Sequence, residues 1–136
     1  MKLRIMSSVL LLSLCHTSFA DLPPKPASCP SISAIQAIGI TYIEQDDGAW
    51  YAGVLTNNYA TNDKWTFALG SITAASESEA RQKATDSLAS LTLQRGPMPT
   101  NFEKWVCLYN NKAGYNTVAI TPAMYPLNAA IKHFKS

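Results

Sequence analysis

Residues 50–73 read WYAGVLTNNYATNDKWTFALGSIT, and this stretch decides the fold because it predicts a hairpin with a tryptophan opening each strand. In the second strand, Trp65, Phe67 and Leu69 alternate with small residues, a period of two that puts the bulky groups on one face. The first strand, opening at Trp50, carries apolar side chains on both faces and is predicted to be central. We expect the two indoles to anchor the core.

A polar loop joins these two strands, and its residue types are those that favour turns. Its exposed side chains are the first candidates for contact with another protein. The candidate interaction residues are Asn57, Asn58, Tyr59, Asn62 and Lys64.

The start of the chain has the pattern of a secretory signal peptide over residues 1–20. Two basic residues precede an apolar run over residues 5–15, and the small residues Ser18 and Ala20 form a cleavage signal. The run is too short to span a membrane, so we do not expect an integral membrane protein. A lipoprotein attached at Cys15 is the alternative, disfavoured because Leu14 stands where a small residue is expected.

Composition beyond the signal argues against binding to nucleic acid. Once Lys2 and Arg4 are removed, nine basic residues face nine acidic ones, so the formal net charge is zero. Residues 104–136 hold four lysines and no acid, which suits either an anionic partner or a solvated surface.

Two cysteines remain in the exported chain, and we expect Cys29 and Cys107 to form a disulfide. This expectation agrees with a periplasmic or extracellular location. A metal site needs more ligands than one histidine, His133, and chains without CxxC or HxxxH spacing rarely hold structural zinc.

The remaining pattern predicts alternating helices and strands. Residues 21–28 form a proline-rich leader, and a short helix over residues 31–38 precedes a strand over residues 40–45. A capping box at Ser76 and Glu79 opens a long helix that should end at Gly96.

The C-terminal part predicts a loop, two further strands and a helix. The loop covers residues 98–103, the strands cover residues 105–109 and 117–121, and an amphipathic helix follows over residues 127–134. Residues 29–136 are therefore expected to form a single small α+β domain. We predict an antiparallel sheet of about five strands with the helices collected on one side: a long helix packed on one face and short helices at both ends.

Few combinations of residues in the sequence are typical of a catalytic site. We therefore predict a binding module and no enzyme, and an enzyme of unknown class is the remaining alternative. A serine or cysteine nucleophile needs a positioned base, and His133 lies close to the C-terminus. Asp46 and Asp47 suit a turn better than an acid/base pair.

Haem iron takes His, Met, Cys or Tyr as axial ligands, and the sequence offers several of these residue types. For strand tyrosines, packing in the sheet is the competing interpretation. Candidate ligands are Tyr51, Met124, Tyr125 and His133.

Four segments resemble a family of small secreted Legionella proteins, some of them named hemin-binding proteins. The segments are residues 29–39, Trp50 to Gly53, Trp65 to Phe67 and Trp105 to Cys107. The resemblance implies hemin binding in iron acquisition, with haem as the ligand. The alternative function is a secreted or periplasmic protein interaction domain, effector-like or inhibitor-like, that uses the loop or the cationic end.

Overall fold

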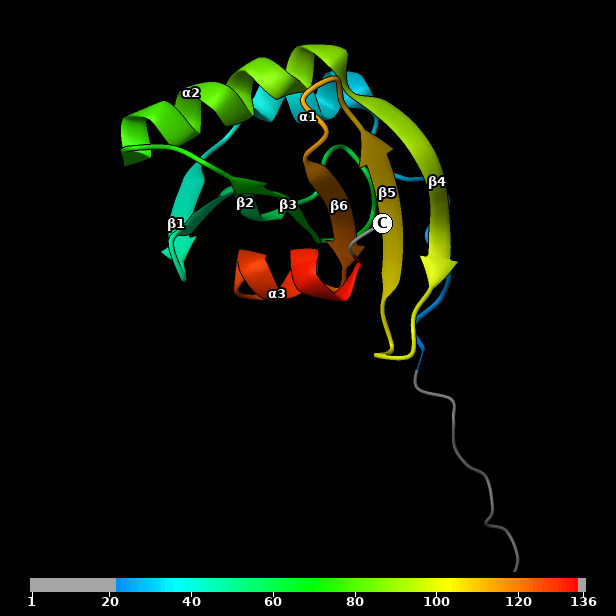
Figure 1. Ribbon diagram of the computed structural model, residues 1–136. Coiled ribbons are helices and arrows are strands. Elements are labelled where there is room, and N and C mark those ends of the chain that lie inside the picture. Colours follow the sequence, from blue (N-terminus) through cyan, green and yellow to red (C-terminus); the bar gives the residue numbers. More distant parts are fainter. Residues whose placement is uncertain (1–21, 135–136) are drawn as a thin grey trace, which may run out of the picture.

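The computed structural model describes residues 22–134, so the expected signal peptide lies outside the described residues. A six-stranded antiparallel sheet with the order β1-β2-β3-β6-β5-β4 forms the centre of the domain. Helices cover both faces of this sheet (Figure 1). The strands are β1 Tyr42–Asp46, β2 Ala49–Asn57, β3 Trp65–Ile72, β4 Thr92–Pro99, β5 Trp105–Asn110 and β6 Asn116–Thr121.

The hairpin β2–β3 confirms the opening pattern of the sequence. Trp65, Phe67 and Leu69 are fully buried on one face of β3, and Ala68 is fully buried on the other. Trp65 is therefore an anchor of the core, whereas Trp50 is half-buried near the edge and donates its indole N–H to the Ala74 carbonyl at 3.0 Å.

A close approach between β2 and β3 requires glycine at one position of the hairpin. A Cβ atom added to Gly53 would lie 1.9 Å from the carbonyl oxygen of Phe67. Real Cβ contacts are never this short, so the two strands could not keep this spacing with any other residue.

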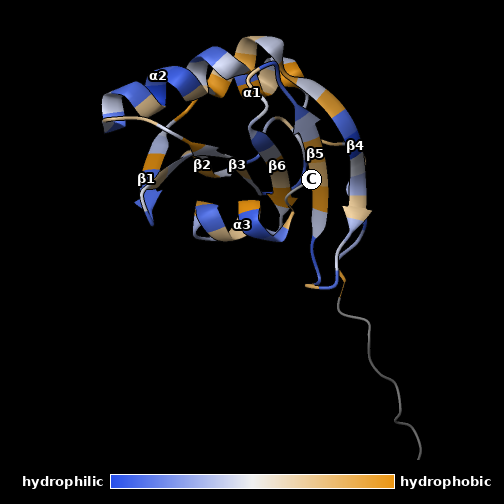
Figure 2. Cartoon of the chain, viewed as in Figure 1, coloured by the Kyte–Doolittle hydropathy of each residue, from blue (hydrophilic) through white to orange (hydrophobic). Residues whose placement is uncertain are grey.

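Helices α1, Ile32–Ile38, and α2, Glu77–Ser87, lie on the same face of the sheet. Ser31 caps α1 by accepting from the Ala34 N–H, and Ser76 caps α2 by accepting from the Glu79 N–H at 3.1 Å. Figure 2 shows hydrophilic residues along α2 and hydrophobic residues on β5 and β6. The core between this face and the helices includes Ile35, Val54, Trp65, Phe67, Leu69, Ile72, Leu88, Leu91 and Tyr109.

The long predicted helix is shorter than expected, and a sixth strand replaces its end. Helix α2 stops at Ser87, a 3₁₀ turn covers Leu88–Ser90, and β4 follows. The serine hydroxyls at this point bond to backbone carbonyls, Ser87 to Ala84 and Ser90 to Ser87, and such bonds compete with helix continuation. Leu88 and Leu91 still reach the core, as their periodic spacing predicted.

Strand β4 escapes sequence analysis because Gly96, Pro97 and Pro99 lie within it. Proline is tolerated at the edge of a sheet, where one side of the strand has no partner to bond. The pairing of β4 with β5 is interrupted on both sides of Arg95, which accommodates these residues.

Helix α3, Leu127–His133, covers the face of the sheet opposite to α1 and α2. The expectation of helices collected on one side is therefore wrong for α3, although its position in the sequence was predicted. It packs on a second core that includes Tyr51, Ala68, Val106, Leu108, Val118, Ile120, Leu127 and Ile131. The sheet is apolar on both faces, so one layer of helices would leave half of its core exposed.

The described part of the proline-rich leader, residues 22–28, has no regular secondary structure and lies against the domain. The side chain of Pro26 is buried, and the Pro23 carbonyl accepts from the Trp105 indole at 2.9 Å. The disulfide between Cys29 and Cys107 then ties this end of the chain to β5, which confirms the predicted pairing.

Candidate functional site

Two of the four predicted ligand residues belong to the core under α3. Tyr51 is only 5% exposed, and Met124 packs against the same cluster of apolar side chains. Packing in the sheet therefore accounts for Tyr51, and Met124 is half-buried at the margin of the same core.

The other two lie at opposite ends of α3. Tyr125 precedes the helix, is 57% exposed, and its hydroxyl forms a hydrogen bond with that of Thr56. His133 is the last residue of the helix and is exposed. The Tyr125 hydroxyl is engaged by Thr56, and no ring or hydrogen-bond contact joins Tyr125 to His133 among the described residues, so the structure does not bring these two side chains together.

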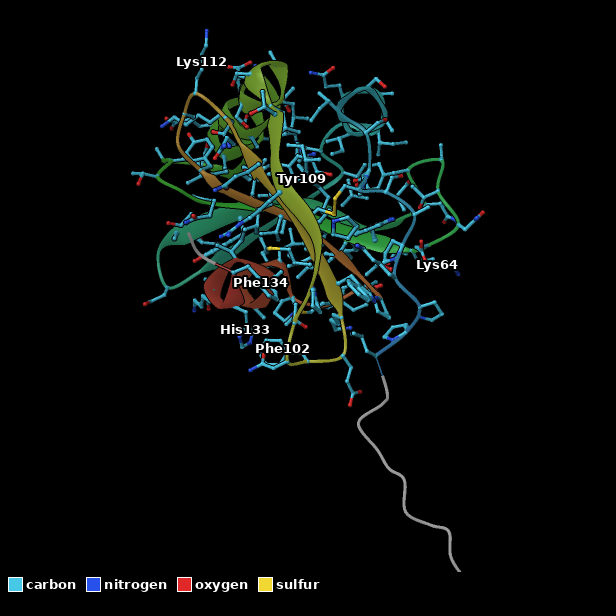
Figure 3. The ribbon with its side chains drawn as sticks, turned by 90° about the vertical axis from the view of Figure 1, so that its right-hand side faces the viewer. Lys64, Phe102, Tyr109, Lys112, His133 and Phe134 are labelled. Carbon is cyan, nitrogen blue, oxygen red and sulfur yellow. A yellow bond between two sulfur atoms is a disulfide. The ribbon has the colours of Figure 1, made fainter. Side chains whose placement is uncertain are left out.

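Three rings gather at the surface where α3 ends, and we call Phe102, His133 and Phe134 the aromatic cluster. The ring centroids of Phe102 and His133 lie 4.5 Å apart, and Phe134 lies 6.2 Å from each of them. Figure 3 shows the three side chains together at one end of the molecule, beside α3. Phe102 is 41% exposed and Phe134 is half-buried, so the cluster joins the core to a solvent-facing imidazole.

The loop between β4 and β5 holds Phe102 in this position. The hydroxyl of Thr100 accepts hydrogen bonds from the backbone N–H groups of Phe102 and Lys104, at 3.1 and 3.3 Å. The Lys104 ammonium donates to the carbonyls of Pro122 and Ala123, at 3.0 and 3.3 Å. These contacts fix the loop to the segment that leads into α3.

Contacts from β1 hold α3, the helix that carries His133, against the sheet. The Glu44 carboxylate accepts from the backbone N–H groups of Leu127 and Asn128. Asp46 accepts from the Asn128 amide at 2.9 Å and from the Lys132 ammonium at 3.1 Å. The hydrogen bond from Lys132 is the main reason why the pKa of Asp46 lies below its usual value. These two acids therefore dock α3 on the edge of the sheet.

The imidazole of His133 has no hydrogen-bond partner within residues 22–134. It lies against the rings of Phe102 and Phe134. A neutral imidazole carries a nitrogen lone pair that binds transition metals, including haem iron. The cluster therefore offers one nitrogen ligand framed by two apolar rings.

The predicted interaction loop is more ordered and more buried than its composition suggests. Tyr59 is only 3% exposed and meets the ring of Phe67 edge-on, so it anchors the loop and is not available to a partner. The side chain of Asn57 accepts from the Tyr59 N–H at 2.9 Å. The side chains that stay exposed are those of Asn58, Asn62 and Lys64.

The hydroxyl of Thr61 organises the tip of this loop. It accepts from the Trp65 indole at 2.9 Å and from the Asp63 N–H at 3.1 Å. A small cleft of about 220 Å³ separates the tip from Ala27 and Ser28 of the leader. The loop is therefore a rigid polar projection, on a different part of the surface from the aromatic cluster (Figure 3).

The three described lysines of the cationic end are dispersed, and Lys135 lies outside the described residues. Lys104 and Lys132 are engaged in the contacts described above, and Lys112 extends from the turn between β5 and β6, far from the aromatic cluster (Figure 3). Lys112 borders a hollow of about 470 Å³ between that turn and the end of α2. Lys104, Lys112 and Lys132 therefore do not form a single patch.

Two further features, a metal-ligand cluster and a membrane-spanning helix, are absent from the described part of the chain. No group of three or more His, Cys, Asp or Glu side chains is arranged to hold a metal ion within residues 22–134. The longest helix in that range, α2, has eleven residues, and none of the helices there is long and apolar enough to cross a membrane.

Residues 28–125 match the family described as a domain of unknown function (DUF4949). The chain belongs to this family. No curated protein and no solved structure matches the chain.

The DUF4949 match covers both cysteines of the disulfide and all six strands but ends before α3 begins. Phe102 therefore lies within the family domain, whereas His133 and Phe134 lie beyond it. Sequence analysis identified His133 as a candidate but missed both phenylalanines. No local signal marks Phe102, because its partners come from a helix distant in the sequence.

Proposed function

We propose that this protein is a small exported binding module without enzymatic activity, and that its ligand is hemin. The observation that carries the proposal is the 4.5 Å separation between the rings of Phe102 and His133 at an exposed surface. His133 would supply the axial nitrogen to the iron, and Phe102 and Phe134 would contact the porphyrin edge. An aromatic ring and a flat macrocycle attract each other through buried apolar area and stacking.

The surroundings of His133 favour binding over catalysis. A histidine that activates a nucleophile forms a hydrogen bond with it and is oriented by a third group. Within residues 22–134, no serine, cysteine or acidic side chain forms a hydrogen bond with this imidazole. The resemblance to secreted Legionella proteins named for hemin binding supports the same ligand.

The signal-peptide pattern and the disulfide support the exported part of this proposal. The pattern over residues 1–20 is typical of a cleaved signal peptide, and disulfides persist in oxidising compartments. The Cys29–Cys107 bond is compatible with such a compartment. Hemin from outside the cell would reach a periplasmic or extracellular protein before it enters the cytoplasm. Iron acquisition is therefore the proposed context.

Titration of hemin into the purified protein tests this function. We expect a shift of the Soret band, and we expect His133→Ala to abolish it because the axial nitrogen is lost. Tyr125→Phe is the matched control, since that side chain lies at the other end of α3 and should leave the shift unchanged. An unchanged hemin spectrum at micromolar protein would contradict the proposal.

A second candidate function is protein interaction through the loop between β2 and β3. Its support is the rigidity of the loop, which Tyr59 anchors from below and Thr61 organises at the tip. A preorganised loop loses little conformational entropy when a partner binds. The exposed side chains that a partner would meet are Asn58, Asn62 and Lys64.

Capture of binding partners from host and bacterial lysates, with the purified protein as bait, tests the loop as an interface. The triple variant Asn58→Ala, Asn62→Ala and Lys64→Ala should lose a partner that the wild-type protein retains. Lys112→Ala, which changes an exposed lysine elsewhere, should retain it. Equal capture by both variants would count against the loop as an interface.

A further inference from the structure

We infer that the hollow between the end of α2 and the turn that joins β5 to β6 binds a small zwitterion, a free amino acid with an apolar side chain. This site is separate from the aromatic cluster, so its ligand is independent of hemin. Figure 3 shows Lys112, which borders the hollow, at the opposite end of the molecule from Phe102 and His133. The hollow combines unpaired opposite charges, apolar side chains and walls that hydrogen bonds hold in place.

Two opposite charges line this hollow without pairing. Asp86 comes from the last turn of α2, and Lys112 comes from the facing turn. The Asp86 carboxylate accepts from the Gln82 amide at 2.8 Å, but neither Asp86 nor Lys112 forms an ion pair with any of the described residues. The hollow thus presents one unpaired carboxylate and one unpaired ammonium, which suit a ligand that carries both charges itself.

The third charged side chain of the lining, Lys83, already has partners. Its ammonium lies 3.1 Å from the Glu79 carboxylate and donates to the Thr73 carbonyl at 2.7 Å. The C-terminal end of a helix carries partial negative charge, which together with Asp86 favours a ligand cation on the α2 side. We therefore expect the ammonium of the ligand at Asp86 and its carboxylate at Lys112.

The rest of the lining suits an apolar group on the ligand. Ala89, Ala113 and the half-buried Tyr115 line the hollow, and Tyr115 also packs against the core. The volume of about 470 Å³ lies within the range of small-ligand sites. An apolar side chain of the ligand would lose its contact with water here, which favours binding.

Hydrogen bonds fix both sides of the hollow before a ligand arrives. The backbone N–H of Lys112 donates to the Ser90 hydroxyl at 2.9 Å, and that hydroxyl donates to the Ser87 carbonyl at 3.2 Å. Within the turn, the Asn111 amide donates to the Tyr115 carbonyl at 2.9 Å and accepts from the Tyr115 N–H at 3.1 Å. A ligand that enters a preorganised site causes little further loss of conformational entropy.

Titration of the purified protein with L-phenylalanine, followed through the NMR shifts of the backbone amides, tests this site. We expect saturable shifts confined to residues 83–90 and 111–115. N-acetyl-L-phenylalanine lacks the ammonium, and L-phenylalaninamide lacks the carboxylate. Each should bind about threefold to fivefold more weakly than L-phenylalanine, the expected result of losing one exposed ion pair.

Substitution of the two charged residues assigns each of them to its group on the ligand. Asp86→Asn should weaken the binding of L-phenylalanine but not that of N-acetyl-L-phenylalanine, which has no ammonium to pair with the carboxylate. Lys112→Gln should likewise weaken L-phenylalanine but not L-phenylalaninamide. Asp47→Asn and Lys64→Gln are the controls, because they remove the same charges at exposed positions elsewhere and should not change the affinity.

Three results would overturn this site. The first is the absence of saturable shifts up to about 10 mM L-phenylalanine. The second is equal binding of the three compounds, because the two charges would then not contribute. The third is an equal loss of affinity in the control variants, which would reduce the effect to net charge. Each of these results leaves the hemin titration as a separate test of the proposed function.

Discussion

Glu44 and Leu127 are joined by a hydrogen bond across 83 residues: the carboxylate of Glu44 in β1 accepts the backbone N–H of Leu127, the first residue of α3, at 3.2 Å. The second carboxylate oxygen accepts from Asn128 at 3.1 Å. Pro126 precedes the helix and provides no side-chain cap. A distant strand thus supplies the capping group that the helix lacks, and its negative charge suits a helix N-terminus.

Replacement of Glu44 should loosen α3. We expect Glu44→Ala to lower the free energy of unfolding by about 1 to 2 kcal/mol, as for the loss of a helix cap, and Glu44→Gln to have a smaller effect. Urea denaturation measures both. The exposed Glu103→Gln should change stability by less than about 0.5 kcal/mol. If Glu44→Ala were as stable as that control, the docking role would be wrong.

The ion pair between Asp46 and Lys132 predicts a dependence of stability on pH. Hydrogen bonds from Lys132 and Asn128 lower the pKa of Asp46 in the folded state, so its contribution is present above the unfolded pKa. It is lost as the pH falls through the lower, folded pKa. We expect the melting temperatures of wild type and Asp46→Asn to differ most above about pH 5 and to converge well below pH 4.

Asp47→Asn is the control for this pH series. It removes the neighbouring charge, which has no ion pair among the described residues, and asparagine tolerates the left-handed backbone found there at φ 53°. Its melting temperature should follow that of the wild type throughout. A gap for Asp46→Asn that stays constant down to pH 2 would rule out the ion pair as its cause.

Loss of the hydroxyl from two buried tyrosines should have different effects on the free energy of unfolding. Tyr109 donates to the Pro30 carbonyl at 2.6 Å, whereas the buried hydroxyl of Tyr59 has no partner among the described residues. Desolvation raises the pKa of both groups well above the ordinary value for tyrosine. We expect Tyr109→Phe to cost about 1 kcal/mol and Tyr59→Phe to be neutral or stabilising, measured by urea denaturation. A larger cost for Tyr59→Phe would reveal a bond at its hydroxyl.

The disulfide should make a large contribution to stability. Cys29 and Cys107 are 78 residues apart, and on the chain-entropy estimate a loop of that length stabilises the fold by about 4 to 5 kcal/mol. The variant with both cysteines replaced by alanine should lose about this amount in urea denaturation. Reduction of the wild-type protein should cause a similar loss. A loss below about 1 kcal/mol would indicate that residual structure already restrains the unfolded chain.

Local patterns predicted most of the elements correctly. The capping box at Ser76 and Glu79, the Asn57 to Lys64 loop and the alternation in β3 involve residues close in the sequence. These features are formed by interactions between residues close in the sequence, so they can be predicted without knowledge of tertiary contacts. The end of α2 and strand β4 were missed because pairing with β5 overrides the weak local preference of residues 92–99.

The candidate site was predicted less completely than the fold. His133 was identified by its residue type, but the sequence carries no sign that Phe102 would lie against it. The loop residue Tyr59 was expected at the surface because its neighbours are polar, and the structure buries it against Phe67. Exposure of a single aromatic residue in a loop depends on what packs beneath it, which local composition does not report.

The sequence by itself determined the α+β class, the disulfide and the hairpin, because period-two alternation, helix caps and a pair of cysteines are local or countable signals. Only the tertiary structure decided that α3 covers the opposite face, where Glu44 and Asp46 of β1 receive it. That docking places His133 beside Phe102. The reason is physical: a pattern defines which side of an element is apolar, but the sheet has two apolar faces, and long-range contacts select between them.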